Sequence, residues 1–367
     1  MTNATVSVLA LGALGAEAPS FRVRTRLPSA ELGNYGVAMR HLPLFTAQQD
    51  RLFHEAGTAR RIDVLLSART RLRRQLVAGG DWDVTLIQRQ VDLLPGLGLE
   101  RRAAGNRRVV LDVDDAIWLD HRFGEAGGHR LAALKGTSRK VRWLATRADV
   151  VIAGNDLLGD WLSRYSSSVA VVPSLVEHRE IAPRIHQPRD RLVVGWIGSA
   201  STAPLLERVV VPLRRLAAAV PDLEIEFLAV GGRAPAVPGL RVRSERWSED
   251  REREFLRQAD IGVMPLEDSE WFRGKCSYKA LQYMAAGIPV VADDVGVSAR
   301  VIGHEESGLI ARGADQWVEH LVALARDPRL RARLGAAGRL RVQKDFSVER
   351  WAPRLASLLR GESRTGA

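Results

Sequence analysis

The sequence predicts an α/β protein whose two domains are each built on a parallel β-sheet. Short apolar runs alternate with helical segments through most of the 367 residues, which is typical of strand–helix–strand units. A chain of this length exceeds one hydrophobic core of usual size. Residues 177–190 are polar, contain two prolines and lack periodicity, so they interrupt the alternation. We expect a first domain in residues 1–180, a linker in 181–191, a second domain in 192–346 and a terminal helix in 347–361.

In the first half, runs of β-branched and other apolar residues predict the strands. These are Val6–Leu11, Asp83–Ile87, Arg108–Val113, Val150–Ala153 and Val169–Val172. The first run begins a stretch, residues 6–15, that imitates a signal peptide. It lacks the positively charged leading region of such a peptide, so we interpret it as a buried strand that runs into a glycine loop.

The second half repeats the alternation. Its predicted strands are Leu192–Ile197, Glu224–Val230, Leu240–Val242, Ile261–Met264, Pro289–Ala292 and Gly308–Ile310. Its predicted helices are Pro204–Ala219, Ser248–Gln258, Tyr278–Ala286, Ala314–Arg326, Arg329–Val342 and the amphipathic Ser347–Arg360. Two parallel α/β domains joined by a linker imply a ligand site at the carboxyl ends of the strands.

The composition describes a globular protein, with 46% hydrophobic and 26% charged residues. Its single cysteine, Cys276, excludes an internal disulfide framework and suits a reducing compartment. No apolar run approaches the roughly 20 residues of a membrane-spanning helix. We expect a cytoplasmic protein, with peripheral contact to the inner face of a membrane as a further option.

The net charge of +11 indicates acidic partners, such as nucleotides or anionic lipid headgroups. Nucleic acid is not expected, because the chain shows no zinc spacing or RNA-binding signature. The densest basic run is Arg69–Arg74, inside a segment that also carries apolar residues. It could form an amphipathic helix on a membrane surface, with a solvated helix face as the alternative.

Lysine is rare in this chain, and two lysines lie close together. Among 54 basic residues five are lysines, and Lys275 and Lys279 are four positions apart. On one helix, positions four apart share a face, so both ammonium groups could meet one diphosphate. Two solvated lysines are the alternative.

Two strand ends also carry candidate ligand groups. Gly198, Ser199, Ser201 and Thr202 precede a helix expected from Pro204, which suits a phosphate at a helix N-terminus. An ordinary Ser/Thr cap is the alternative. The strand that ends at Val263 and Met264 is broken by a proline, so exposed backbone there could bind a flat base.

These residues resemble a known family. Residues 265–266, Trp271, residues 274–276 and residues 279–291 are similar to the nucleotide-sugar-binding segment of family 4 glycosyltransferases. The similarity continues through residues 194–202 and 259–262, and it is weaker in the first half. The resemblance implies the GT-B fold, in which two Rossmann-like parallel α/β domains face each other across a cleft. It also implies that the terminal helix packs back on the first domain.

The implied activity is retaining transfer of a sugar from a nucleotide-diphosphate donor to a hydroxyl acceptor, with no further cofactor. The acceptor would be a glycan, a lipid-linked saccharide or a small natural product. A nucleotide-sugar epimerase and a non-catalytic scaffold are the alternatives.

The chain departs from the family at several positions. Gly274 and Gln282 replace two glutamates of many members, and Trp196 and Ser201 replace an Arg and a Lys that hold the diphosphate. The resemblance then leaves Lys275, Lys279 and Arg273 as the substitutes that supply positive charge, while Gln282 can still bind a ribose hydroxyl.

In the first half, the resemblance implies that Asp114 faces the sugar and stabilises positive charge there. Asp112, Asp114 and Asp115 could instead hold a metal, although enzymes of this fold generally use cationic side chains, so none is expected. Arg22 and Arg24 could reach the donor phosphates, or they are surface arginines. His129 is interpreted as structural or as an acceptor contact.

Overall fold

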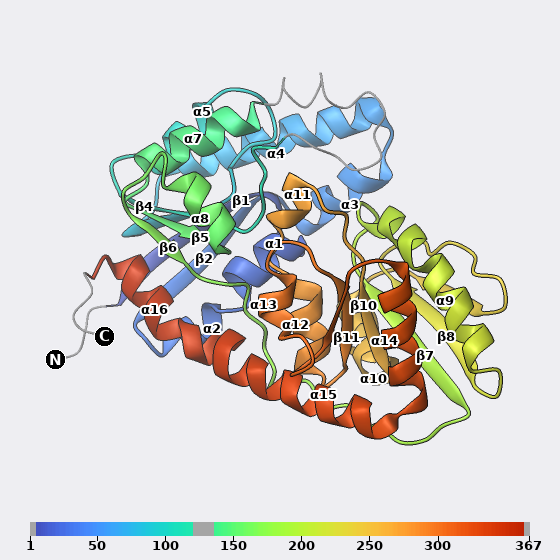
Figure 1. Ribbon diagram of the computed structural model, residues 1–367. Helices are drawn as coiled ribbons and strands as arrows, with labels where there is room; N and C mark the ends of the chain where they lie inside the picture. Colours follow the sequence, from blue (N-terminus) through green and yellow to red (C-terminus); the bar gives the residue numbers. More distant parts are fainter. Residues whose placement is uncertain (1–4, 120–135, 363–367) are drawn as a thin grey trace. The chain divides into compact units, whose positions relative to one another are not determined.

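The computed structural model describes residues 5–119 and 136–362, so His129 lies outside the described residues. The chain divides into two compact units. Among the described residues, unit 1 comprises 5–119, 136–175 and 348–362, and unit 2 comprises Val176–Ser347. Each unit is built on a six-stranded parallel sheet, so the predicted α/β class with two parallel sheets is confirmed (Figure 1).

The sheet of unit 1 has the strand order β2-β1-β3-β4-β5-β6. The strands are β1 (Val6–Gly15), β2 (Val37–Phe45), β3 (Val84–Gln88), β4 (Arg108–Val113), β5 (Val150–Ala153) and β6 (Val169–Val171). β2 was not predicted from the sequence, and it occupies one edge of the sheet. Its pairing with β1 runs from Val6 opposite Val37 to Gly15 opposite Phe45.

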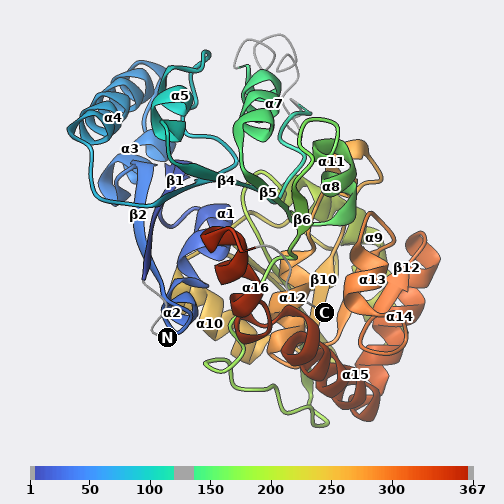
Figure 2. The same cartoon turned by 90° about the vertical axis from the view of Figure 1, so that its left-hand side faces the viewer.

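Helices cover both faces of this sheet (Figure 2). One face carries α1 (Pro19–Phe21), α2 (Ser29–Gly33) and α16 (Val348–Arg360), and the other carries α4 (Thr58–Ala78), α5 (Gly98–Ala104) and α7 (Thr137–Arg147). The remaining segments are the π-helical turn η1 (Arg22–Arg26), α3 (Ala47–Glu55) and α8 (Asp156–Leu162). Leu355, Leu358 and Leu359 place α16 in the hydrophobic core of unit 1.

The sheet of unit 2 has the order β12-β11-β10-β7-β8-β9. The strands are β7 (Arg191–Ile197), β8 (Glu224–Val230), β9 (Arg241–Glu245), β10 (Ile261–Met264), β11 (Val290–Asp293) and β12 (Leu309–Ala311). This is the doubly wound arrangement, and the strand order reverses between β7 and β10. Ligands of such sheets bind outside the carboxyl ends of the strands at this reversal.

Two apolar clusters pack on the two faces of the second sheet. One joins it to α9 (Glu207–Ala219) and α14 (Ala314–Arg326), and the other joins it to α10 (Glu249–Gln258) and α12 (Tyr278–Ala285). The other segments are η2 (Ala203–Leu206), α11 (Glu270–Arg273), α13 (Ser298–Ile302), α15 (Pro328–Arg341) and η3 (Val342–Phe346). Within the described residues, no helix is both long enough and apolar enough to span a bilayer.

Candidate functional site

The segment that follows β7 forms a hydroxyl-lined loop at the carboxyl edge of the second sheet. Ser199 and Ser201 bring their Oγ atoms to 2.8 Å, and Thr202 donates its hydroxyl to the Ser199 carbonyl at 3.2 Å. Thr202 precedes η2, but among the described contacts its side chain makes no capping hydrogen bond to that helix. The structure therefore does not support the simple Ser/Thr cap, and we name residues 198–202 the β7 loop.

Lys279 points its ammonium group at this loop from α12. Its Nζ donates to the Thr202 hydroxyl at 3.1 Å and lies 5.0 Å from the ring centroid of Trp196. None of the described acidic side chains forms an ion pair with it. Although water reaches part of the side chain, protein surrounds the ammonium group, and burial followed by the charge of Lys275 lowers the pKa of Lys279 to about 7.

Lys275 does not share a helix face with Lys279, which corrects the expectation from their spacing. Ser277, at the N-cap of α12, adopts φ 52°, a left-handed conformation that a right-handed helix does not continue through. Lys275 therefore lies in the turn between α11 and α12, with its Nζ 4.9 Å from the Trp271 ring centroid. Its charge nevertheless lies close enough to contribute to the low pKa of Lys279.

Trp196 shows why the β7 loop takes its shape. Its side chain is 1% exposed and belongs to the apolar cluster beneath the sheet. A Cβ at Gly198 would lie 2.3 Å from the Trp196 ring and 2.8 Å from Cε of Lys279. Glycine at this position therefore allows the backbone to pass between the indole and the lysine.

Substituting Gly198 by alanine is expected to weaken donor binding about tenfold by displacing Lys279, and to lower the melting temperature. The flexible lysine stem yields more readily than a tryptophan packed in the core. Nucleotide titration calorimetry and thermal unfolding measure the two effects. Gly33→Ala is the control, because an added Cβ there meets no atom within 4 Å.

Arg273 and Gln282 occupy different settings. Arg273 is exposed, and its guanidinium donates to Asp268 at 2.6 and 3.0 Å, so its charge is already balanced in the free protein. The hydrogen bond from Arg273 holds the pKa of Asp268 below its usual value. Gln282 is 5% exposed and lies one turn beyond Lys279 on α12. Gly274 ends α11.

Val263 and Met264 are buried at the end of β10 and pair there with β11. The carbonyl of Val263 accepts a hydrogen bond from the Tyr283 hydroxyl at 3.4 Å. Val263 therefore does not offer the exposed backbone carbonyl expected for base recognition.

Arg208 is a cation near the strand ends that the sequence did not single out. It lies in the first turn of α9, is about half exposed and places Nε 3.4 Å from Asp293 Oδ2. Asp293 ends β11 and also accepts hydrogen bonds from the Leu266 amide and the Trp317 indole, at 2.8 and 2.9 Å. Arg208 lies six residues after the β7 loop, and this position in the sequence could have suggested it as a candidate.

In unit 1, Asp114 follows β4 and is held by neighbouring side chains. Arg89 Nε donates to its carboxylate at 2.6 Å and Gln88 Nε2 at 3.0 Å, while Arg89 Nη2 lies 3.4 Å from Asp115. Arg89 adopts φ 65°, a strained conformation for a residue with a side chain, which the two carboxylates and the Asp112 carbonyl maintain.

Arg24 is not a surface arginine, and its guanidinium group is already bound by other groups of unit 1. Its Nε and Nη2 bind the Asp112 carboxylate at 2.9 and 2.7 Å, and its Nη1 donates to the carbonyls of Val172 and Pro173. Both charged side chains are under 5% exposed. The proposed phosphate role of Arg24 conflicts with this buried ion pair. Arg22 is partly buried in the same π-helical turn.

The basic run Arg69–Arg74 lies in α4, whose apolar side chains Val64, Leu65, Leu72 and Leu76 are buried in unit 1. Arg69 binds the buried carboxylate of Asp92, and Arg71 donates to two backbone carbonyls. Most of the apolar side chains expected to insert into a membrane are therefore covered by protein, whereas Leu66 is 45% exposed.

Parts of this chain are similar to known proteins. Residues 191–327 match the model of the family described as glycosyl transferases group 1. A D-inositol 3-phosphate glycosyltransferase from Stackebrandtia nassauensis is 31% identical over 208 residues, which cover 49% of this chain and 46% of the relative. A GDP-mannose-dependent monoacylated α-(1-6)-phosphatidylinositol monomannoside mannosyltransferase from Corynebacterium glutamicum is 36% identical over 86 residues, covering 23% and 22%. The chain thus spans less than half the length of these curated relatives.

Solved structures match over nearly the whole chain. Sucrose-phosphate synthase from Thermosynechococcus elongatus has a TM-score of 0.69 at 16% identity, covering 97% of this chain and 98% of that one. The Anabaena protein HepE, solved with UDP and glucose, has a TM-score of 0.63 at 14% identity, covering 97% and 100%. At such identities the likeness establishes the fold. The chain has the GT-B fold, and its residues 191–327 are similar to the group 1 glycosyl transferases.

Proposed function

We propose that this protein is a retaining glycosyltransferase that moves a sugar from a nucleoside-diphosphate donor to an acceptor hydroxyl. The observation that carries the proposal is Lys279, an ammonium group enclosed by protein at the switch point of the second sheet, with no acidic partner among the described side chains. A charge in such a setting is costly unless an anion completes it. The names of the relatives, and the UDP and glucose bound to HepE, support a nucleotide sugar as that anion.

In the proposed mechanism, the β7 loop hydroxyls, Lys279 and Lys275 hold the donor diphosphate. When the bond between the anomeric carbon and the phosphate oxygen breaks, negative charge grows on the diphosphate and these groups stabilise it. The acceptor hydroxyl attacks from the same face and gives its proton to the departing phosphate. Asp114, fixed by Arg89 and Gln88, stabilises the positive charge of the sugar.

Thermal-shift titration with UDP-, GDP-, ADP- and TDP-sugars is the first test, because a ligand that binds the folded state raises the melting temperature. The proposal predicts that one donor series stabilises the wild type and, at the same concentration, stabilises Lys279→Met less. If none of the four stabilises the wild type, donor binding is contradicted.

A donor that binds is then incubated with acceptors of three kinds: glycans, lipid-linked saccharides and small hydroxyl compounds, including D-inositol 3-phosphate, which a relative's name specifies. NMR of the product reads the anomeric configuration, and inversion would contradict the retaining mechanism. Turnover of the donor without acceptor, beyond slow hydrolysis, would indicate an epimerase. A Lys275→Ala/Lys279→Ala protein with full biological activity would indicate a scaffold.

Donor binding is expected to weaken as the pH rises above about 7. Lys279 has a pKa of about 7 in the free protein, and a bound diphosphate favours its protonated form. Binding above this pH must therefore take up a proton, and the dissociation constant rises by up to about tenfold per pH unit. Titration calorimetry of a nucleotide sugar binding to the protein, repeated in buffers of different ionisation enthalpy, measures the number of protons taken up. A nucleotide sugar suits this test because its diester phosphates do not titrate near neutrality. Equal proton uptake by Lys279→Met would contradict the assignment.

The same low pKa has a consequence for stability in the absence of donor. Between about pH 7 and the usual lysine value of 10.5, the unfolded chain binds the Lys279 proton and the folded protein does not. The unfolding free energy contributed by this group therefore increases with pH across that window and is lowest below pH 7.

We further propose that transfer needs no metal ion. The three clustered carboxylates that could attract one are already paired with arginines, Asp112 with Arg24 and both Asp114 and Asp115 with Arg89. Cationic side chains of unit 2 then supply the charge for the diphosphate. Activity is expected to stay within twofold after treatment with EDTA, and a loss that added Mg²⁺ or Mn²⁺ restores would contradict this.

A further inference from the structure

The second sheet splits at the point where its strand order reverses. Within the described residues, β7 and β10 pair through Val194 with Ile261 and Gly195 with Gly262. Beyond that point β7 stays paired with β8 as far as Ile197, and β10 stays paired with β11 as far as Met264. The last two residues of β7 and of β10 therefore diverge from each other while each remains in the sheet.

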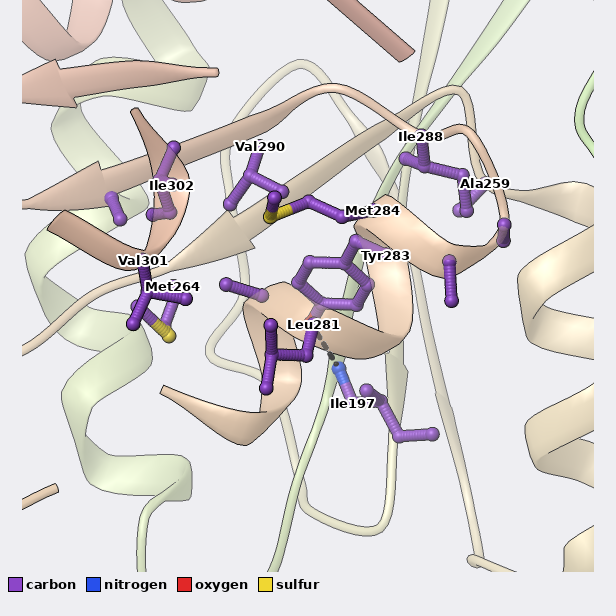
Figure 3. Close-up of a cluster of buried hydrophobic side chains, with 14 of the residues drawn as sticks. Ile197, Ala259, Met264, Leu281, Tyr283, Met284, Ile288, Val290, Val301 and Ile302 are labelled. Atoms are coloured by element: carbon purple, nitrogen blue, oxygen red, sulfur yellow. Dashed lines mark hydrogen bonds between the residues drawn. The ribbon is translucent and has the colours of Figure 1, made fainter. Parts of the chain in front are cut away.

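The hydroxyl of Tyr283 fills this split. It accepts a hydrogen bond from the Ile197 amide at 2.9 Å, which Figure 3 shows, and donates to the Val263 carbonyl at 3.4 Å. These backbone groups belong to the two diverging strands, and buried backbone groups need such partners. Burial raises the pKa of the Tyr283 phenol, which keeps the hydroxyl protonated and able to donate.

The ring of Tyr283 is also held in place by its packing. The side chain is 0% exposed, and the Phe255 ring centroid lies 5.9 Å from its own. A Cβ at Gly262 would lie 2.4 Å from the Tyr283 ring, so glycine lets the ring approach β10 closely. The hydroxyl therefore has little freedom to leave the split.

Tyr283 and Lys279 are four positions apart within α12, so they lie on the same helix face. One reaches the end of β7 through Ile197, and the other reaches the loop that follows it through Thr202. We propose that Tyr283 is a positioning residue, whose hydroxyl holds β7 and β10 apart and sets α12 against the end of β7 so that Lys279 meets the donor diphosphate. This inference rests on the proposed function of Lys279.

The test compares Tyr283→Phe with the wild type, using whichever of UDP, GDP, ADP and TDP binds the wild type most tightly. The substitution removes one oxygen atom and keeps the ring. We expect the dissociation constant to rise about tenfold, as for a small displacement of a binding group. With the nucleotide sugar of the same base, whose diester phosphates do not titrate near neutrality, we also expect the pH at which binding begins to weaken to move, because the surroundings of Lys279 change.

Met284→Ala is the matched control. Met284 is as buried as its neighbour Tyr283, but it points away from the split toward Val290 and packs against Gly338 (Figure 3). This variant is expected to lose thermal stability and to bind the nucleotide within twofold of the wild type. Equal weakening in the two variants would show a general effect of core loosening and would overturn the positioning role.

Hydrogen exchange of the wild type adds a test that needs no variant to fold. The Ile197 amide is expected to exchange as slowly as the paired amides of β7, and fast exchange would overturn the proposal. If Lys279→Met loses binding while Tyr283→Phe retains it, only the role of Tyr283 fails. If none of the four nucleotides binds the wild type, the proposed function and this inference fail together.

Discussion

Replacing Lys279 with methionine is expected to weaken nucleotide-diphosphate binding about 10- to 100-fold while slightly raising the melting temperature. The affinity loss follows from the removal of a charge-assisted hydrogen bond, worth about 1.5–3 kcal/mol. Stability is expected to move the other way, because the ammonium group lacks an acidic partner among the described side chains and is surrounded by protein. Calorimetry and thermal unfolding of the same preparation measure both changes.

Lys344→Met is the matched control for this prediction. Lys344 is exposed in η3 of the same unit, so its replacement removes one positive charge away from the β7 loop. Binding by the control should stay within twofold of the wild type. A similar loss in both variants would mean that net charge attracts the nucleotide, and a lower melting temperature for Lys279→Met would mean that the lysine stabilises the fold.

The periodicity of the chain predicts most strands of both sheets, but not β2. That strand contains Arg40, His41 and Pro43, which interrupt an alternating apolar pattern. Its position at the edge of the sheet explains why it tolerates them, because a proline that lacks an amide hydrogen costs little where one side of a strand is unpaired. Edge position is a property of the folded sheet, and a local pattern does not reveal it.

The candidate site was likewise predicted only in part from the sequence. Composition alone singled out Lys275 and Lys279, and the glycine and hydroxyl pattern singled out the β7 loop. The contact between Lys279 and Thr202 joins positions that are 77 apart in the chain, so it depends on the fold. The hydroxyl of Tyr283 escaped notice because its partners are backbone groups on two other strands, and a tyrosine in an apolar helix reads as core.

The sequence left the role of Arg24 open between a phosphate contact and a surface residue. The structure buries it in an ion pair, so its replacement is expected to cost much of the stability of the fold. Arg24→Met is expected to lower the free energy of unfolding by about 3–5 kcal/mol, because it leaves a buried carboxylate without its counter-charge. The partner is Asp112, 88 residues away, and the two side chains are 3% and 4% exposed. Urea unfolding measures the loss. Arg26→Met is the control, since its ion pair with Glu17 is solvent-exposed and should contribute less than about 1 kcal/mol.

The pH dependence of Arg24→Met identifies Asp112 as the cause. Burial raises the pKa of Asp112, and the charge of Arg24 opposes that rise in the wild type. Without Arg24 the pKa rises further, so the folded variant binds a proton that the unfolded chain releases. That contribution to stability is complete below the usual value of 3.8 and is lost as the pH rises through the folded pKa. The deficit of the variant should therefore shrink as the pH is lowered from 7 toward 5.

Adding Asp112→Leu to Arg24→Met should recover most of the lost stability, because an apolar pair can replace a buried ion pair at little cost. Recovery should remain incomplete, since the carbonyls of Val172 and Pro173 lose the Nη1 donor in both variants. If the double variant is no more stable than Arg24→Met, those carbonyl contacts, rather than the orphaned carboxylate, explain the loss. If Arg24→Met unfolds like Arg26→Met, the buried ion pair does not stabilise unit 1.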